Sequence, residues 1–434
     1  MERILRFVLG LVHTIIKSAS MEEDSIVIDV RPYERARRRC PVCGKKCRAY
    51  DVMPHARRWR ALDLGGMCCY LRYRLTRVEC PDHGVHTESV PWARPNSRFT
   101  RSFEDQVAWL SCYCCRSVVS ELMRIDWKTV GPICQRVHDA LEREKGLSRY
   151  DGLRRIGIDE TSYKKGYKYM TVIVDHDRCR VIWAAKGHGK AQLDAFFSLL
   201  TDEQKASIEV VTADGAGWIA DAVKQHCPNA EQVMDPFHVV SWGTDALDEL
   251  RRQVWRDARK SEQANPIPKR KRGRPKKGEE VPPLKSATIK GARYPLLKNP
   301  ENLSRPQTEL LEAIARSDPR LYRGYLLKES LRDVFKATDG EEAEARLKSW
   351  LSHACRCRIP EFVELSRKVR KRKDDIVRAV ALRISNARIE AINNKIKLTI
   401  RMGYGFRNID NLIALVMLRC SDLKPQLPGR CQAA

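Results

Sequence analysis

The sequence predicts a multidomain protein centred on an α/β core, which has a mixed five-stranded sheet and a helical insertion. A small β domain and an all-α domain precede this core. Three observations predict this organisation: residues 153–240 alternate strand and helix signals, residues 36–90 are basic and carry paired cysteine and histidine residues, and residues 98–145 have helical periodicity throughout. A chain of 434 residues is also too long for one ordinary hydrophobic core.

The composition narrows the class of protein. Lysine and arginine outnumber aspartate and glutamate by 81 to 55, a net charge of +26, which favours a polyanionic partner such as nucleic acid. Hydrophobic residues make up 43% of the chain, which excludes wholesale disorder, and sixteen cysteines are too sparse for a secreted disulfide scaffold. The apolar run over residues 4–16 is interrupted by polar residues and is too short to cross a bilayer, so we expect a cytoplasmic protein without a membrane span.

Shifts in composition along the chain predict the domain boundaries. The predicted segments are an N-terminal helix and strand (1–35), the cysteine/histidine-bearing β domain (36–92), the all-α domain (98–148), the first part of the core (150–245), an insertion (246–379) with a Pro/Lys/Arg-rich linker at 260–290, the last helices of the core (380–422) and a tail (423–434).

Two short cysteine/histidine pairs in the β domain have the spacing of a metal site. Cys40 and Cys43 are followed by Cys80 and His83, and a glycine after each pair permits the tight turn that directs both side chains toward one ion. Four such ligands suit one structural Zn²⁺ ion. The competing ligands on composition are Cys47, His55 and His86. Residues 59–78 alternate apolar and polar side chains, as a hairpin between the two pairs would.

Basic residues surround these pairs, and a helix-turn-helix pattern follows them. Arg57, Arg58 and Arg60 are predicted phosphate contacts. A short helix ending at residue 123, a four-residue turn and a longer helix from about residue 128 would present Lys128, Thr129 and Gln135 to a major groove. An ordinary helical hairpin is the alternative for this segment.

The core begins with three strands, over residues 155–161, 167–175 and 179–185. A helix (190–200), a fourth strand (208–213), a helix (217–226) and a fifth strand (230–234) follow. A three-stranded meander followed by helix–strand alternation is the element order of a ribonuclease-H-like fold.

Acidic residues occur where two of these strands end. Asp159 follows an apolar strand and Asp214 ends another, and an ionised carboxylate there is costly unless it binds a cation or caps a turn. A magnesium site needs further oxygen ligands, and Glu390 in a helical segment is the candidate third acid. Three carboxylates with two Mg²⁺ or Mn²⁺ ions would form a clamp for attack at phosphorus. Glu160 competes with Asp159, although strand alternation turns it to the opposite face.

These residues occur in an order that resembles the DDE transposases of bacterial insertion sequences, specifically the ISL-three family. The matching motifs are the Cys40/Cys43 and Cys80/His83 pairs, Ile125–Gly131, Gly157–Glu160, Thr212–Gly215, Met234–Val240, Lys298–Leu303, Ser385–Glu390 and Tyr404–Asn408. The resemblance covers nearly the whole chain.

The resemblance implies a catalytic triad of Asp159, Asp214 and Glu390, a helical insertion before Glu390, and binding of double-stranded terminal inverted repeats by the zinc and helix-turn-helix segments. Because two element ends must be held together, we expect a homodimer or larger assembly, associated with the nucleoid through DNA. The pair Asp235 and His238 is similar to a signature found between the second and third acids of several DDE families. A capping aspartate with a packed histidine explains the same pair.

Further DNA contacts are candidates on charge and shape. Arg272 and Arg274 belong to a basic Gly-Arg-Pro run that resembles a minor-groove hook, with a solvated linker as the alternative. Arg388 and Arg407 are candidate phosphate contacts, and Tyr404 or Phe406 is a candidate for stacking on a base. Packing between helices would account for all four.

The sequence therefore predicts a transposase that cleaves DNA at repeat ends and transfers the freed 3′-hydroxyl into target DNA. Two rivals remain at this point. A non-catalytic regulator would bind DNA through the zinc and helix-turn-helix segments without cutting it, and a structure-specific nuclease would cut DNA without joining it.

Overall fold

The computed structural model describes residues 2–213, 216–265, 285–382 and 387–430, and only the backbone of residues 387 and 388. Its contacts divide the chain into two compact units. Unit 1 contains residues 1–153, 160–204 and 391–434, and unit 2 contains residues 154–159 and 205–390.

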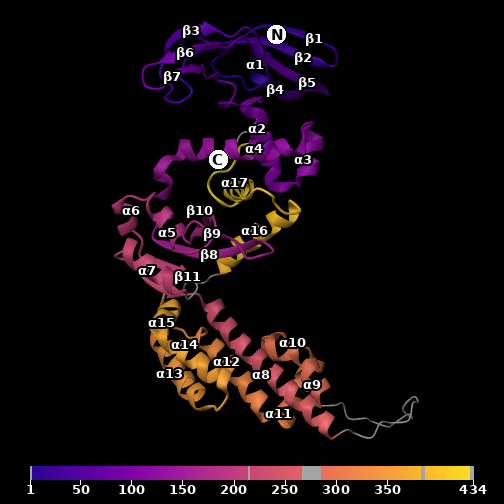
Figure 1. Cartoon of the computed structure of the whole chain (residues 1–434), viewed down its shortest axis with the longest axis vertical. Helices are drawn as coiled ribbons and strands as arrows, with labels where there is room; N and C mark the ends of the chain where they lie inside the picture. Colours follow the sequence, from indigo (N-terminus) through magenta and orange to yellow (C-terminus); the bar gives the residue numbers. More distant parts are fainter. Residues whose placement is uncertain (1, 214–215, 266–284, 383–386, 431–434) are drawn as a thin grey trace, which may run out of the picture. The chain divides into compact units, whose positions relative to one another are not determined.

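The N-terminal part of unit 1 consists of two small sheets (Figure 1). Its elements are α1 (Glu2–Val8), β1 (Thr14–Glu22), β2 (Ser25–Pro32), β3 (Arg48–Val52), β4 (Arg57–Leu64), β5 (Met67–Tyr73), β6 (Thr76–Cys80) and β7 (Gly84–Thr87), with a 3₁₀ turn at Glu34–Ala36. One sheet has the order β1-β2-β5-β4 and the other β3-β6-β7. The antiparallel β4–β5 hairpin confirms the predicted alternation, whereas β1 is a strand that the sequence did not reveal, because only its first residues are buried.

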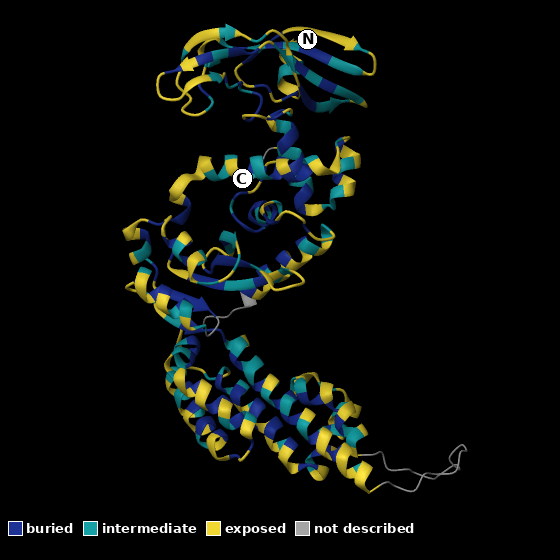
Figure 2. Cartoon of the chain, viewed as in Figure 1, coloured by how far each residue is buried: buried dark blue, intermediate teal, exposed yellow. Residues whose placement is uncertain are grey.

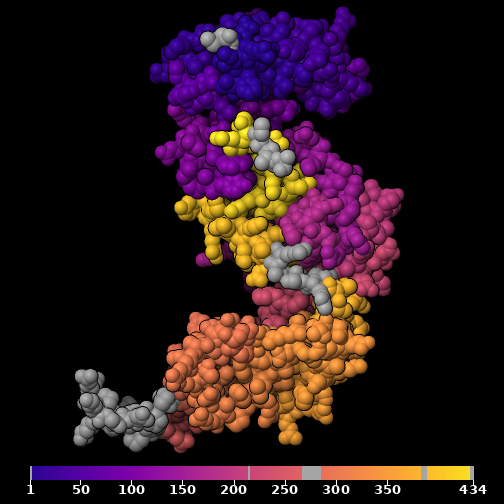
Figure 3. All heavy atoms as spheres, turned by 180° about the vertical axis from the view of Figure 1, so that it is seen from behind, coloured from indigo at the N-terminus to yellow at the C-terminus, as the bar shows by residue number. Residues whose placement is uncertain are grey.

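Three helices follow, and the last two have the order of short helix, turn and longer helix that the sequence predicts. They are α2 (Arg101–Tyr113), α3 (Arg116–Met123) and α4 (Trp127–Lys145), and the 3₁₀ turn Gly146–Tyr150 comes after them. The α3–α4 turn contains Arg124 in the left-handed conformation, and Asp126 caps α4 by accepting a 2.7 Å hydrogen bond from the Lys128 amide. The C-terminal helix α17 (Ile409–Cys420) packs against α2 and α4 in the same unit, and Figure 3 shows its yellow atoms beside those helices.

The central sheet has the order β10-β9-β8-β11-β12. Its elements are β8 (Arg155–Lys164), β9 (Lys168–Asp175), β10 (Arg180–Lys186), α5 (Lys190–Phe197), α6 (Asp202–Ala206), β11 (Val210–Ala213), α7 (Gly217–His226) and β12 (Glu231–Met234). β9 and β10 pair antiparallel, while β11 pairs parallel with both β8 and β12. The sheet is therefore mixed and five-stranded, as predicted, and the apolar runs of its strands are buried because helices cover them.

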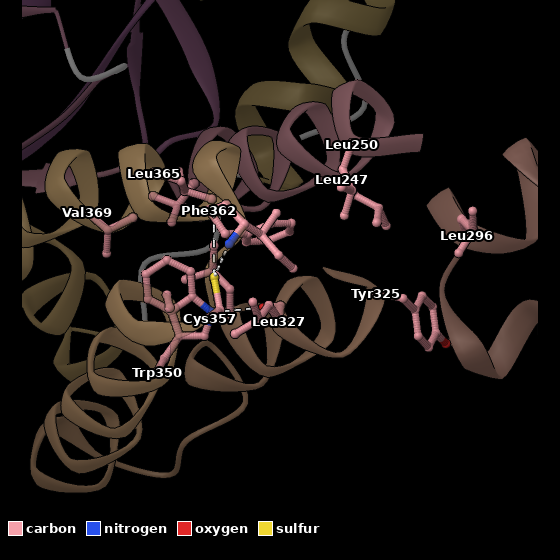
Figure 4. Close-up of a cluster of buried hydrophobic side chains, with 14 of the residues drawn as sticks. Leu247, Leu250, Leu296, Tyr325, Leu327, Trp350, Cys357, Phe362, Leu365 and Val369 are labelled. Carbon is pink, nitrogen blue, oxygen red and sulfur yellow. Dashed lines mark hydrogen bonds between the residues drawn. The ribbon is translucent and has the colours of Figure 1, made fainter. Parts of the chain in front are cut away.

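A helical body occupies most of unit 2. Its helices are α8 (Pro236–Ala264), α9 (Lys285–Gly291), α10 (Arg293–Leu297), α11 (Arg305–Ser317), α12 (Pro319–Val334), α13 (Gly340–Arg356), α14 (Pro360–Lys371) and α15 (Lys373–Ala381), with a 3₁₀ turn at Pro300–Asn302, and α16 (Ala387–Met402) follows. The helices pack through buried side chains that include Leu250, Trp350 and Phe362 (Figure 4). Figure 2 shows the resulting buried stripes facing inward and exposed stripes facing outward.

The helical prediction for residues 303–380 is confirmed. Within the described ranges, no helix combines the length and apolar character needed to cross a membrane.

Candidate metal centres and nucleic-acid interface

The structure brings four predicted ligands, Cys40, Cys43, Cys80 and His83, into one cluster. Their ligand atoms all lie within 4.8 Å of one another. The Cys43 and Cys80 sulfurs are 3.7 Å apart, and His83 Nδ1 lies 3.5 Å from the Cys80 sulfur and 3.9 Å from that of Cys40. Among the described residues this is the one group of three or more such side chains in contact range. A set of three thiols and one imidazole is a tetrahedral zinc donor set.

Local backbone geometry makes this convergence. Each pair occupies a tight turn that ends in a glycine with positive φ, +71° at Gly44 and +74° at Gly84, a region that glycine adopts without strain. The Gly44 amide donates to the Cys40 carbonyl at 3.0 Å, which closes the first turn. Both pairs are then connected through the sheet β3-β6-β7, whose central strand ends at Cys80.

One supporting residue has no signal in the sequence. The buried carboxylate of Glu88 accepts hydrogen bonds from the backbone amides of Arg38 and Thr76, both at 2.8 Å, and from the Tyr73 hydroxyl at 3.1 Å. It thereby connects the chain just before the first cysteine to β6. Nothing in the sequence around this glutamate, which follows β7, indicates such a role.

The electrostatic surroundings of Cys80 suit a metal ligand. The hydrogen bond with His83 lowers the pKa of the Cys80 thiol to about 6, so the thiolate that metals bind is the main form at neutral pH. The three competing residues, Cys47, His55 and His86, lie outside the cluster. The Cys47 thiol donates to the Lys45 carbonyl at 3.3 Å, and burial and the nearby Cys80 thiol raise the pKa of Cys47.

The three predicted phosphate-contacting arginines differ in where the structure places them. Arg58 is exposed on β4 and pairs with Glu22 at 2.6 Å, and Arg57 is half-buried and donates to the Ser97 carbonyl at 2.7 Å. The structure contradicts the prediction that Arg60 contacts phosphate. Only 6% of its surface is exposed and it pairs with Asp63, so it stabilises the interior instead of facing a ligand.

On the helix-turn-helix segment, Lys128 is exposed and Thr129 is half-buried at the start of α4, while Gln135 is half-buried two turns further along. The first turn of α4 is thus accessible at the residues that the sequence singles out.

Two of the three candidate acids are described. Asp159 is half-buried in β8, and Glu390 is exposed in the first turn of α16. One turn after Glu390, Asn393 accepts a 3.2 Å hydrogen bond from Thr161, which lies two residues beyond Asp159 in the same strand. Glu160 is half-buried and points to the opposite face of β8, as strand alternation requires. Asp214 lies outside the described residues.

The Asp235/His238 pair forms the start of α8. The Asp235 carboxylate caps the helix by accepting from the Phe237 amide at 2.8 Å, and its other oxygen lies 3.6 Å from His238 Nε2. Asp235 is buried at the end of β12, and its amide donates to Ala213, the last residue of β11. Asp235 is therefore a helix cap, and it lies beside β11, the strand that precedes Asp214.

In the α16–α17 loop, Tyr404 is 91% exposed and Arg407 is also exposed. The structure also contradicts the prediction that Phe406 stacks on a base. Its side chain is buried, and the Arg116 guanidinium lies 4.5 Å from its ring centre. Arg272 and Arg274 lie outside the described residues, as does the side chain of Arg388.

Comparisons with known proteins agree with this arrangement. Three family profiles match in chain order: the zinc-finger of transposase IS204/IS1001/IS1096/IS1165 over residues 36–83, the helix-turn-helix domain of transposase family ISL3 over residues 88–138, and the ISL3 DDE transposase over residues 156–416. The chain is 47% identical over 437 residues to the transposase for insertion sequence element IS1557 of Mycobacterium tuberculosis, which covers 99% of this chain and 97% of the relative. It is 25% identical over 371 residues to the transposase for insertion sequence element IS1001 of Bordetella parapertussis, 85% of each chain.

The zinc ribbon, the helix-turn-helix segment and the DDE domain, matched in this order, place the chain among the insertion-sequence transposases. The chain belongs to the ISL3 family of that class.

Proposed function

We propose that this transposase cuts DNA at the terminal inverted repeats of its element and joins the freed 3′-hydroxyl to target DNA, using Asp159, Asp214 and Glu390 on a ribonuclease-H-like core. In this proposal the core comprises residues 150–245 and 380–422, and residues 246–379 are inserted within it. The observation that carries the proposal is the parallel register of β8 and β11.

That register relates the first two acids. Gly157 of β8 is paired with Thr212 of β11. Asp159 is two residues beyond Gly157, and Asp214 is two residues beyond Thr212 in the sequence. Asp159 lies within β8 and not at its end as the sequence suggests, because the strand continues to Lys164. Positions equally far beyond a registered pair of neighbouring parallel strands nevertheless lie close together, which supports a shared site for the two carboxylates.

The third acid is related to the first through a hydrogen bond. Thr161 and Asp159 lie on the same face of β8, because side chains two residues apart in a strand do so. Asn393 and Glu390 are three residues apart and share a face of α16. The Thr161–Asn393 hydrogen bond at 3.2 Å therefore supports Glu390 approaching the face of the strand that carries Asp159.

The donor set fits divalent cations that prefer oxygen, Mg²⁺ or Mn²⁺, with the three carboxylates as their ligands. When bound, two such ions supply activation of the attacking hydroxyl and stabilisation of the leaving oxygen at phosphorus. The half-buried position of Asp159 keeps its carboxylate within a strand whose neighbouring residues are fixed by the sheet, so the ligand geometry is organised before DNA binds. Asp235 and His238 are auxiliary in this account and brace the adjoining strand end.

The zinc ribbon and helix-turn-helix segments bind the inverted repeats. Residues 36–92 fold around one structural Zn²⁺ held by Cys40, Cys43, Cys80 and His83, and the charge excess of the chain favours phosphate contacts. Residues 98–148 place the first turn of α4, with Lys128 and Thr129, in a major groove. Two repeat ends must be held together for joining, so the active species is a dimer or larger assembly acting on DNA in the cytoplasm.

The test is a joining assay with purified protein, Mg²⁺, a labelled pre-nicked duplex ending in the element's inverted repeat, and a supercoiled target. Wild type is expected to give joined product, and Asp159→Asn and Glu390→Gln are expected to give none while retaining repeat binding. Asp221→Asn, an exposed acid on α7, is the matched control and should join normally.

Binding without cleavage or joining by the wild type would favour the regulator and leave the triad unsupported. Cleavage without joining, and without preference for repeat ends, would favour the nuclease instead.

A further inference from the structure

The turn that joins β8 to β9 has an unusual composition for a hairpin. It contains Lys164, Lys165 and Lys168 around Gly166 and Tyr167, and all five residues are exposed. Figure 2, with the strand labels of Figure 1, shows this turn at the surface. An exposed tyrosine interleaved with lysines has the composition of a surface that contacts nucleic acid.

The adjoining β10–α5 loop extends this positive surface. Its exposed lysines are Lys186 and Lys190, and the loop lies against the base of the hairpin, because the Gly187 amide donates to the Tyr169 carbonyl at 2.9 Å. The rings of Tyr169 and His188 are 5.2 Å apart. The hairpin and this loop belong to the same unit.

Acidic residues are absent from the stretches of sequence that form this surface. The sequence contains no aspartate or glutamate over residues 161–174 or 178–193. None of the five lysines forms an ion pair with an acid in the described parts of the chain. Some other surface lysines of this protein do, including Lys285, Lys336 and Lys348, which lie 3.0, 2.8 and 3.1 Å from an acid. The positive charge of the hairpin surface is thus available to an anion.

The conformation of Tyr167 also points to a function. Its φ is +56° and it follows Gly166 at φ +88°, so two consecutive residues adopt the left-handed region. Asparagine or glycine occupies such positions easily, whereas a bulky side chain costs about 1 kcal/mol there. The Tyr167 ring is 90% exposed, so folding gains little from it that would offset this cost. Strain of this kind is commonly retained where a side chain serves a ligand.

We infer that this hairpin surface, made of Lys164, Lys165, Tyr167, Lys168, Lys186 and Lys190, contacts the DNA beside the cleavage site. The lysines bind phosphates and the Tyr167 ring lies against a nucleotide. The inference rests on the proposed function, because the distance to the cut is set by Asp159. β8 continues five residues beyond Asp159 to Lys164. At about 3.3 Å per residue this is about 17 Å along the strand, or about five base pairs of duplex.

The experiment measures how the affinity for DNA depends on salt, by fluorescence anisotropy without divalent metal. The probe is a duplex that carries the element's inverted repeat with flanking DNA on both sides of the cut. Each lysine–phosphate contact contributes about 0.9 to the log–log salt slope, so the triple variant Lys164→Gln/Lys165→Gln/Lys168→Gln should have a slope shallower by about 2.7. Between about 50 and 200 mM salt, wild type should lose about 40-fold more affinity than this variant.

The matched control is the triple variant Lys285→Gln/Lys336→Gln/Lys348→Gln, which removes the same charge from lysines that already pair with acids. Its slope should equal that of wild type. Equal slopes for wild type and the hairpin variant would overturn the inference, and so would an equal loss in the control. The difference should disappear on a duplex cut back to fewer than about five base pairs on one side of the cleavage site. Its persistence on both truncated duplexes would also overturn the inference.

Tyr167 is tested separately. Tyr167→Asn should fold at least as stably as wild type, since asparagine tolerates this φ, yet bind the duplex more weakly, because the ring no longer lies against a nucleotide. Tyr167→Phe should bind like wild type. Unchanged binding by Tyr167→Asn would remove the tyrosine from the surface. The salt slope can be read on any duplex, so a wild type without preference for the repeat would defeat the proposed function, while the comparison of slopes would still decide whether the hairpin surface binds DNA.

Discussion

The buried carboxylate of Glu104 on α2 stabilises the helix-turn-helix segment. It is fully buried, and it accepts hydrogen bonds from the Ser97 hydroxyl at 2.7 Å, from Arg136 Nε at 2.8 Å and from Arg94 at 3.3 Å. These partners lie before α2 and on α4. One carboxylate therefore connects the loop that follows the β domain to both the first and the last helix of this segment.

Glu104→Gln keeps the shape of the side chain and removes its charge. Deleting one partner of a buried ion pair costs about 3–5 kcal/mol, because the remaining charge is left uncompensated. The lower end applies, because Arg94 still pairs with Asp105 at 2.7 Å and 28% of the Arg136 side chain is exposed to water. We expect about 3 kcal/mol, which increases the population of the opened segment about 100-fold.

Hydrogen exchange read by mass spectrometry on the full chain measures this opening. Peptides from α2 and α4 should lose about 100-fold protection, while peptides from the helical body of unit 2 serve as the internal reference. Asp105→Asn is the matched control, since Arg94 keeps its pair with Glu104, and it should cost less than tenfold. Protection in Glu104→Gln within about fivefold of wild type would refute the reasoning.

Three further predictions concern stability and metal binding. Hydrogen bonds from Arg72 lower the pKa of Asp29, so Asp29→Asn should destabilise the four-stranded sheet by about 1 kcal/mol at neutral pH. In thermal melts this difference should vanish as the pH falls below 3.8, because the wild-type carboxyl then protonates, and an equal difference at both pH values would contradict the prediction. Elemental analysis should find one zinc per chain in the wild type and in Cys47→Ser, and none in Cys43→Ser. The reverse result would show that the proposed ligand set is wrong. Gly324→Ala places a Cβ 2.5 Å from a leucine methyl in the helical core. Urea unfolding should show a free energy of unfolding lower by about 1 kcal/mol, because overpacking costs more than the gain in helix propensity contributes. A stabilised variant would show that the core rearranges without cost.

The sequence was informative wherever the signal is local. The apolar strands around Ile156, Val172 and Val211 are recognisable because each is buried on both faces, and their order predicts a mixed sheet. The metal cluster was predictable for the same reason. Each pair supplies two ligands from one turn, so only one long-range event, the pairing of β6 with its neighbours, has to bring the pairs together.

Residue type alone could not predict which basic and aromatic side chains are buried and which are exposed. Arg60 lies in a basic stretch, yet it is buried between the rings of Tyr70 and Phe103, because α2 covers that end of β4. Phe406 is buried and its ring lies against Arg116 of α3, whereas Tyr404, two residues earlier, remains exposed. Both outcomes depend on which element packs above the residue, and that information is distributed over distant parts of the chain.

For the candidate acids, the separation along the chain limits what the sequence can predict about their proximity. The strand pairing that relates Asp159 to β11 follows from the order of the elements, but Glu390 comes after the whole insertion. No local pattern positions α16, and the contact of Thr161 with Asn393 is the first evidence for where its acidic face lies.

The central claim is that Asp159, Asp214 and Glu390 hold the same divalent ions. Zinc-loaded protein can be given Fe²⁺ in place of Mg²⁺ and then peroxide and ascorbate, so that hydroxyl radicals cut the backbone next to the bound iron. The account predicts cuts near all three acids, all suppressed by excess Mg²⁺ and all lost in Asp159→Asn, while Asp221→Asn cuts like wild type. Cuts confined to one acid, or cuts near the other two that persist in Asp159→Asn, would contradict a shared site.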